Sequence, residues 1–143
     1  MEEELWRRYD RDHMKTEQNS LNRSELKTLF HEVGSEDRLR LILRDFYRRM
    51  AVDILVGFFF TNKNPESVAD QQVSFLMRAM GQSPSYRGKS PAQAHGQLPP
   101  ILAGHFDRRL KILEETLREH GISEGAIQLW LRFENSFKAG IVG

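Results

Sequence analysis

The 143-residue sequence contains no cysteine and no apolar run near the length of a membrane span. Without cysteine, the chain cannot hold disulfides, cysteine-ligated zinc or iron–sulfur sites, or a thiol nucleophile. A membrane-crossing helix needs about 20 apolar residues, and the acidic start Met1-Glu2-Glu3-Glu4 is unlike a secretory signal. An excess of one charge is also missing, because 21 Lys and Arg residues face 20 Asp and Glu residues. We therefore expect a cytoplasmic protein that binds neither membranes nor nucleic acid.

Sustained alternation of apolar and polar residues, the pattern of half-buried strands, is absent as well, whereas helical spacing is common. Between 37 and 50 the apolar residues follow one helix face: Leu39, Ile42, Leu43, Phe46, Tyr47 and Met50. Asn64 and Pro65 form a good helix start, with asparagine as the N-cap and proline at the first helical position. That helix should run to about Met80. Other helices are predicted over 24–33, over 103–120 and from Ser123 along a stripe that ends at Ile141. The expected fold is all-α.

Two segments interrupt this helical pattern. Residues 81–100 contain four prolines and three glycines, and only 90–97 could form a short helix there. Residues 1–23 are charged and polar, with Trp6 as a candidate anchor, and we interpret them as an N-terminal helical or disordered extension. One domain would then occupy 24–143, a length that suits a single core.

Three polar side chains lie on the apolar faces of the predicted helices: Tyr47, Gln72 and Arg109. A buried hydroxyl or amide without a partner costs about 1–3 kcal/mol. Tyr47 and Gln72 therefore either find partners within the core or share a ligand pocket. Arg109 has a third option, since arginine can extend its guanidinium to nearby solvent. The residues alone leave these alternatives open.

Motifs of common enzyme classes are missing: there is no HExxH, no paired carboxylates, no GxSxG and no glycine-rich loop after a strand. Hydrolase and nucleotide-binding functions therefore have little support. His95 lies in the possible short helix of the proline-rich stretch, and by itself such a histidine is usually a packing or surface residue. A haem iron, however, requires only one such imidazole and a pocket with large apolar walls.

Six motifs, in order along the chain, closely resemble those of the truncated haemoglobins, the bacterial two-over-two globins. They are Arg44-Asp45-Phe46-Tyr47-Arg48-Arg49-Met50, Gly57-Phe58-Phe59-Phe60, Gln72-Val73-Ser74-Phe75, Tyr86-Arg87-Gly88, Ala94-His95 and His105-Phe106-Asp107-Arg108. The resemblance covers about residues 24–140. It implies a globin-like sandwich in which two helices pack on two others, with a mostly irregular segment at 81–100.

The resemblance also implies a cofactor, haem b (iron protoporphyrin IX), with His95 as the proximal ligand of the iron. Phe60 matches the phenylalanine that packs flat against the porphyrin. Tyr47 matches the distal tyrosine that hydrogen-bonds an iron-bound ligand, and Gln72 matches the glutamine that assists it. Val68 occupies the distal gate position, where many globins have histidine. Phe75 and Leu76 would line the pocket behind these residues.

Other positions would meet the edge of the cofactor. Tyr86 is a candidate partner of the haem propionates by family position, and Arg87 and Lys89 are candidates by charge. Arg109 departs from the family, because related branches place a tryptophan there. It could pair with a propionate, reach solvent or contact the ligand.

The function that the resemblance implies is reversible binding of dioxygen, or of NO or CO, at a five-coordinate iron. One alternative is a haem enzyme on the same scaffold, a nitric oxide dioxygenase or a peroxidase, which would need an external reductase. Another is a haem-free or sensory globin module that acts by protein interaction.

Overall fold

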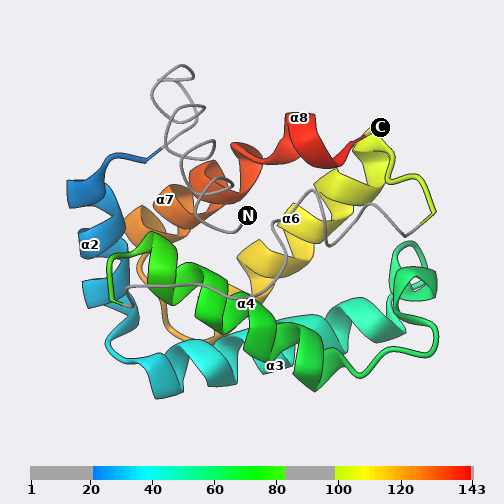
Figure 1. Cartoon of the computed structure of the whole chain (residues 1–143), viewed down its shortest axis with the longest axis horizontal. Helices are drawn as coiled ribbons and strands as arrows, with labels where there is room; N and C mark the ends of the chain where they lie inside the picture. Colours follow the sequence, from blue (N-terminus) through cyan, green and yellow to red (C-terminus); the bar gives the residue numbers. More distant parts are fainter. Residues whose placement is uncertain (1–20, 83–98, 143) are drawn as a thin grey trace.

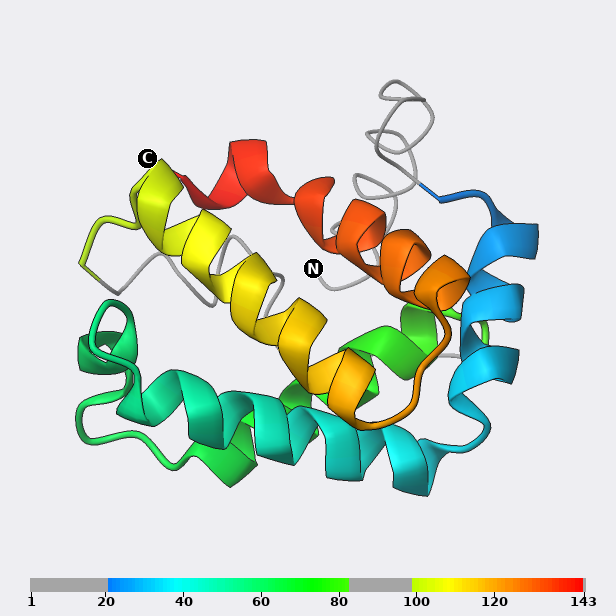
Figure 2. The same cartoon turned by 180° about the vertical axis from the view of Figure 1, so that it is seen from behind.

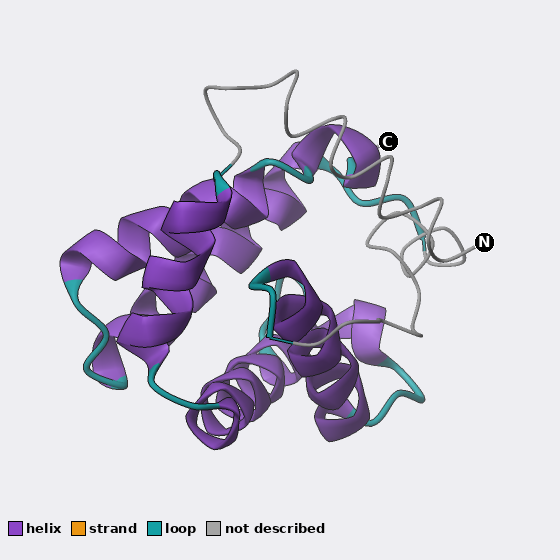
Figure 3. Cartoon of the chain, turned by 60° about the vertical axis from the view of Figure 1, so that its left-hand side comes forward, coloured by secondary structure: helices purple, strands orange, loops and turns teal. Residues whose placement is uncertain are grey.

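The computed structural model describes residues 21–82 and 99–142, and this part of the chain is built from helices joined by loops (Figure 3). The long helices are α2 (Arg23–Val33), α3 (Glu36–Val52), α4 (Pro65–Ala79), α6 (Ala103–Glu119) and α7 (Glu124–Asn135). There are also two short elements in the described ranges. The 3-10 helix η1 (Gly57–Phe60) lies between α3 and α4, and the single-turn helix α8 (Lys138–Ile141) follows α7. None of the helices in the described ranges has the length and apolar character needed to cross a bilayer.

The helices form two layers. Helix α3 packs against α4 in one layer and against α6 in the other, while α6 packs against α7 (Figures 1 and 2). Helix α2 packs across the end of α7. The predicted two-over-two globin sandwich is therefore confirmed. The described ranges contain no strand, and their only β-type pairing is an isolated parallel bridge between Ile101 and Val142.

Helix α3 is the central element of the fold, and its sequence explains its limits. The Ser35 hydroxyl accepts a hydrogen bond from the backbone N–H of Arg38 and caps the first turn. The acidic residues in that turn stabilise the helix, because their negative charges lie near the positive end of the helix dipole. All six apolar positions predicted for this helix are buried: Leu39, Ile42, Leu43, Phe46, Tyr47 and Met50. One face of α3 therefore supplies the middle of the core.

The starts of two other helices follow from local side-chain chemistry. The side-chain Oδ1 of Asn64 accepts a hydrogen bond from the backbone N–H of Glu66, with Pro65 in the first turn of α4, as predicted. Asn22 and Glu25 form a reciprocal capping box at the start of α2. That helix ends at Gly34, whose φ of 98° is favourable for glycine.

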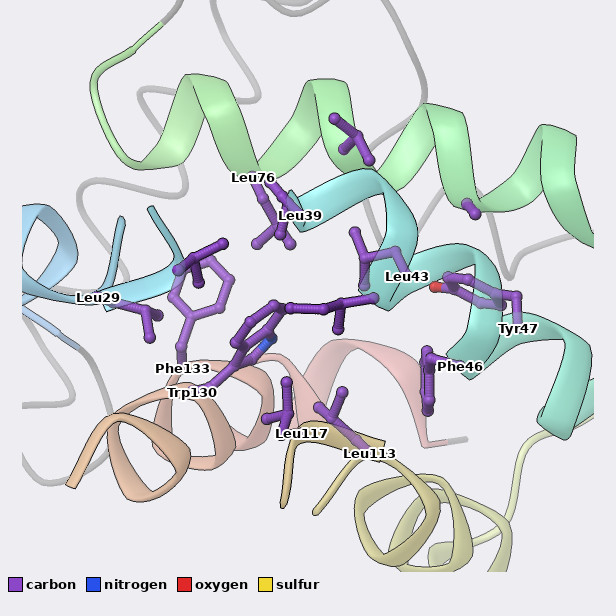
Figure 4. Close-up of a cluster of buried hydrophobic side chains, with 14 of the residues drawn as sticks. Leu29, Leu39, Leu43, Phe46, Tyr47, Leu76, Leu113, Leu117, Trp130 and Phe133 are labelled. Atoms are coloured by element: carbon purple, nitrogen blue, oxygen red, sulfur yellow. The ribbon is translucent and has the colours of Figure 1, made fainter. Parts of the chain in front are cut away.

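Large side chains from both layers meet in the core around Trp130 and Phe133 (Figure 4). On α6, Phe106, Leu113 and Leu117 are buried as predicted, whereas Leu110 is only half-buried. The buried face of α6 is completed by Ile112 and Thr116, whose hydroxyl bonds the Ile112 carbonyl. The inner face is thus wider than the predicted stripe.

The last helix was predicted to run from Ser123 to Ile141, and here the prediction was wrong in one respect. Helix α7 ends at Asn135, and α8 begins only at Lys138. At the break, the N–H of Ser136 still bonds the carbonyl of Arg132, while the N–H of Phe137 bonds that of Glu134. The second of these hydrogen bonds spans three residues instead of four, so the turn is tighter. Phe137 still packs against the core.

Candidate functional site

A cavity of about 410 Å³ opens between the two layers, beside η1. This volume lies within the range of roughly 300–1,000 Å³ that is typical of small-molecule and cofactor sites. Most of its wall is apolar, and the residues that form this part are Met50, Val56, Phe59, Phe60, Val68, Phe75, Ile101, Phe106, Phe137 and Ile141. The other lining residues are polar or charged: Tyr47, Lys63, Asn64, Ser67, Gln71, Gln72, His105, Arg109 and Glu134. The cavity thus combines a large apolar surface with several directional groups.

Tyr47 contributes a phenol to this cavity from the buried face of α3. Its side chain is held between two rings: the Phe46 ring lies 4.9 Å away and the Phe60 ring 5.9 Å away, centroid to centroid. Burial raises the pKa of Tyr47 above its ordinary value, and the Glu134 carboxylate acts in the same direction, while the Arg109 charge opposes them. The hydroxyl is therefore protonated at physiological pH and can donate a hydrogen bond.

Arg109 reaches the same cavity from α6 and is paired inside the protein. Its Nη1 donates to Glu134 Oε2 at 2.7 Å, and its Nη2 donates to the Tyr47 hydroxyl at 3.2 Å. The guanidinium carbon also lies 5.1 Å from the centroid of the Phe46 ring. Burial alone would lower the pKa of Arg109, but the Glu134 charge, together with the interactions with Tyr47 and the hydrogen bond to Glu134, outweighs it and raises the pKa. Of the open alternatives, free extension to solvent does not occur, because the side chain is only 14% exposed.

Glu134 is a charged residue of this site that was not predicted from the sequence. It lies in the last turn of α7, and its side chain is 7% exposed, which is rare for a carboxylate unless it is paired. Besides Arg109, it accepts a hydrogen bond from the indole N–H of Trp130 at 3.3 Å. The spacing of Trp130 and Glu134 on one helix was the available signal, because residues four apart share a face.

Three of the four α4 positions expected at the pocket line the cavity. Val68, Gln72 and Phe75 line it, and so does Phe60 from η1. Leu76 is different: it is fully buried in the core, on the side of α4 near Leu39 (Figure 4), and is not among the residues that line the cavity. Successive helix positions point about 100° apart, so Phe75 and Leu76 face different surroundings.

Four of the expected site residues, His95, Tyr86, Arg87 and Lys89, lie outside the described residues. A histidine that was given no cofactor role, His105, does line the cavity. Its Nδ1 accepts the backbone N–H of Leu102 at 3.0 Å, and its ring makes an edge contact with Phe59. That hydrogen bond leaves Nε2 as the protonated nitrogen of the neutral ring.

The described walls fit the cofactor that the resemblance implies. Haem presents wide apolar faces, which the aromatic and aliphatic lining can cover, and one polar centre where a ligand binds. Tyr47, Gln72 and Arg109 are among the polar residues of the wall, and Arg109 donates a hydrogen bond to the Tyr47 hydroxyl. The wall therefore offers hydrogen-bond donors for a polar ligand within a largely apolar surface.

Comparisons with known proteins agree with this geometry. A family model described as "Bacterial-like globin" matches residues 28–140. A group 1 truncated haemoglobin of Tetrahymena thermophila is 33% identical over 100 residues, which cover 70% of this chain and 82% of that protein. A crystal structure of a truncated haemoglobin variant from Tetrahymena pyriformis, in the Fe(III) form, is 26% identical. It superposes with a TM-score of 0.74 over 81% of this chain and 98% of the other.

A further solved structure shows the same fold at lower identity. It is the 2/2 haemoglobin of Synechococcus sp. PCC 7002, in the cyanomet state with covalently attached haem. That protein is 24% identical and gives a TM-score of 0.66 over 75% of this chain. The two-over-two helices, the cavity beside η1, the family match over 28–140 and the identity to curated relatives all agree. The chain belongs to the truncated haemoglobin family and is a haem-binding globin.

Proposed function

We propose that the protein holds haem b in the cavity beside η1 and binds dioxygen reversibly, with NO and CO as further ligands. The observation that carries this proposal is that Tyr47, Gln72 and Arg109 all line one largely apolar cavity, in which Arg109 donates a hydrogen bond to the Tyr47 hydroxyl. A neutral, apolar ligand would need no such donors, whereas dioxygen gains partial negative charge when it binds to ferrous haem. These donors therefore favour a ligand that accepts hydrogen bonds.

Each side chain has a distinct task in this proposal. His95 would ligate the iron from the proximal side, and Phe60 and Phe75 would pack against the cofactor. Tyr86, Arg87 and Lys89 would meet its propionates. Bound haem supplies an open coordination position for a diatomic ligand.

On the distal side, Tyr47 would donate its hydroxyl proton to the ligand and Gln72 its amide N–H. Val68 carries no donor, so the hydrogen bonding falls to those two residues. Glu134 and Trp130 would act indirectly, by holding Arg109 beside Tyr47.

Absorption spectra of the ferric, ferrous and carbonyl forms test the cofactor assignment. We expect a globin Soret band and stoichiometric haem in the purified protein, and His95→Ala should weaken or shift that band. The matched control is His31→Ala, since His31 is exposed on α2, away from the cavity. Normal haem uptake and an unchanged spectrum in His95→Ala would contradict the assignment. A protein purified without haem would instead favour a module that acts by protein interaction.

The Arg109 guanidinium in the cavity wall supports a second candidate function, a nitric oxide dioxygenase or peroxidase. A fixed cation beside the ligand position could polarise a bound peroxide. This activity needs a reductase as partner, and a reducing compartment such as the cytoplasm would suit it. Turnover with a competent electron donor decides the matter: if the oxygenated protein reacts with NO without forming nitrate, the dioxygenase function fails.

A further inference from the structure

We propose that Arg109 is a positioning residue that turns the Tyr47 hydroxyl into an obligatory hydrogen-bond donor toward the cavity. The pocket would thereby discriminate ligands that accept hydrogen bonds from those that do not. This inference rests on the proposed function, because it assigns a cause to the donor role of Tyr47.

The Tyr47 hydroxyl and the Arg109 guanidinium differ in their hydrogen-bonding capacity. A phenol oxygen has one proton to donate and lone pairs to accept with, whereas a guanidinium only donates. In the 3.2 Å contact between Arg109 Nη2 and the Tyr47 oxygen, the hydroxyl must therefore accept. Its single proton stays available for another acceptor, and no second partner of this hydroxyl occurs within residues 21–82 and 99–142.

The guanidinium of Arg109 is held in place by its neighbours. Its other nitrogen is held at 2.7 Å by Glu134, and its guanidinium lies over the Phe46 ring. Glu134 is itself fixed by the indole N–H of Trp130. Because the side chains of Arg109 and Glu134 are only 14% and 7% exposed, water offers little competition for these bonds. The donor that faces Tyr47 is therefore held in one place.

Without the Arg109 cation, the Tyr47 hydroxyl would have another acceptor for its proton. Glu134 lines the same cavity as Tyr47, and its carboxylate is a strong acceptor for a hydroxyl proton. With Arg109 in place, the carboxylate is occupied by the guanidinium. If Arg109 alone were removed, the Tyr47 proton could turn toward the free carboxylate and away from the ligand.

The experiment compares four haem-loaded proteins: the wild type, Tyr47→Phe, the double variant Arg109→Met/Glu134→Gln, and the triple variant that combines all three changes. The double variant removes both charges together, because a buried charge left alone destabilises strongly. It keeps an amide oxygen at position 134 as an acceptor for the Tyr47 proton. Stopped-flow measurements give the dissociation rates of dioxygen and CO. The infrared C–O stretch of the carbonyl form reports the hydrogen bond to the ligand independently of any rate.

We expect the double variant to release dioxygen at least about fivefold faster than the wild type, the effect of losing roughly 1 kcal/mol of ligand stabilisation. The CO dissociation rate should change less than the dioxygen rate. The C–O band should move toward that of Tyr47→Phe. In the triple variant the dioxygen rate should match that of Tyr47→Phe, since the two changes act through one hydroxyl.

The outcomes separate this inference from the function on which it rests. If Tyr47→Phe accelerates dioxygen release but the double variant does not, the positioning role of Arg109 is wrong and the distal role of Tyr47 stands. If the double variant changes the rates while its C–O band stays at the wild-type frequency, Arg109 acts by another route and the inference also fails. If Tyr47→Phe itself has no effect, the proposed ligand chemistry of Tyr47 fails first.

Discussion

Arg109 on α6 and Tyr47 on α3 are 62 residues apart in the sequence, yet their side chains are joined by a 3.2 Å hydrogen bond at the cavity wall. The bond connects the two layers of the fold, because α3 belongs to one layer and α6 to the other. The same two side chains therefore contribute to the packing of the sandwich and to the polar part of the cavity wall. A substitution of Arg109 or Tyr47 must therefore be tested for its effect on stability and for its effect on ligand binding.

Replacing Tyr47 by phenylalanine should accelerate dioxygen release and autoxidation. Loss of one donor to a polarised ligand costs about 1–3 kcal/mol, which corresponds to a rate increase of roughly 5- to 150-fold. Stopped-flow dissociation kinetics measure the effect, and thermal unfolding of the same sample shows whether the fold is intact. An unchanged dissociation rate would mean that Tyr47 does not reach the ligand.

The dioxygen dissociation rate should be independent of pH over a range in which a free phenol begins to ionise. Burial raises the pKa of Tyr47, so its hydroxyl should stay protonated up to at least about pH 10, the ordinary value for tyrosine. Dissociation rates between about pH 6 and pH 9.5 test this point, with Tyr47→Phe as the control for other titrating groups. A rise in the wild-type rate near pH 9 that Tyr47→Phe does not share would refute it.

Gly57→Ala should destabilise the turn that carries the aromatic wall of the cavity. A Cβ atom at Gly57 would lie 2.8 Å from the backbone oxygen of Ala51, so the backbone would have to shift. Such overpacking typically costs about 1–3 kcal/mol, and urea unfolding measures it. Gly104→Ala on α6 is the matched control, because a Cβ there meets nothing within 4 Å. It should be neutral or stabilising by up to about 1 kcal/mol. Equal effects of the two changes would argue against the steric explanation.

Asp53→Asn should lower the free energy of unfolding at neutral pH, and the difference should shrink in acid. The Asp53 carboxylate accepts hydrogen bonds from Arg108 at 2.7 Å and from the backbone N–H groups of Leu55 and Val56. The bond from Arg108 is the main reason that the pKa of Asp53 is lowered in the folded protein. A lowered pKa adds stability above the unfolded value, about 3.9, and that contribution is lost as the pH falls through the folded pKa.

Urea unfolding between pH 7 and pH 3 checks this prediction. At pH 7 the loss should be about 1.5–3 kcal/mol, the range for hydrogen bonds to a charged group. The exposed Asp107 on α6 provides the control, because Asp107→Asn should change the stability by less than about 0.5 kcal/mol. A difference between wild type and Asp53→Asn that persists undiminished at pH 3 would contradict the proposed cause.

The helices could be predicted from the sequence where packing and local chemistry agree. On α3, all six predicted apolar positions are buried, because one long face meets both neighbouring helices. The break between α7 and α8 could not be predicted in the same way. Phe137 and Ile141 continue the four-residue spacing of Phe133, so the periodicity passes through Ser136 without interruption. The backbone tightening at that residue leaves no mark on the apolar pattern.

The site was predictable only in part for a similar reason. Polar residues on apolar faces identified Tyr47, Gln72 and Arg109, and all three line the cavity. The partner of Arg109 could not be found by spacing, because Glu134 is 25 residues away on another helix. Its burial depends on how α6 and α7 pack together. Pairing between helices is a tertiary property that periodicity within one helix does not contain.

The buried pair of Arg109 and Glu134 limits how this family member can change over evolutionary time. Leaving one of two buried charges unpaired costs about 3–5 kcal/mol, whereas a folded domain has only about 5–15 kcal/mol of stability in total. A lineage that replaced either residue alone would approach the limit of folding. We therefore expect these two positions to be exchanged together, or nearly so, in relatives that lack the pair. On this argument we expect the Arg109–Glu134 part of the cavity wall to be inherited as a unit rather than residue by residue.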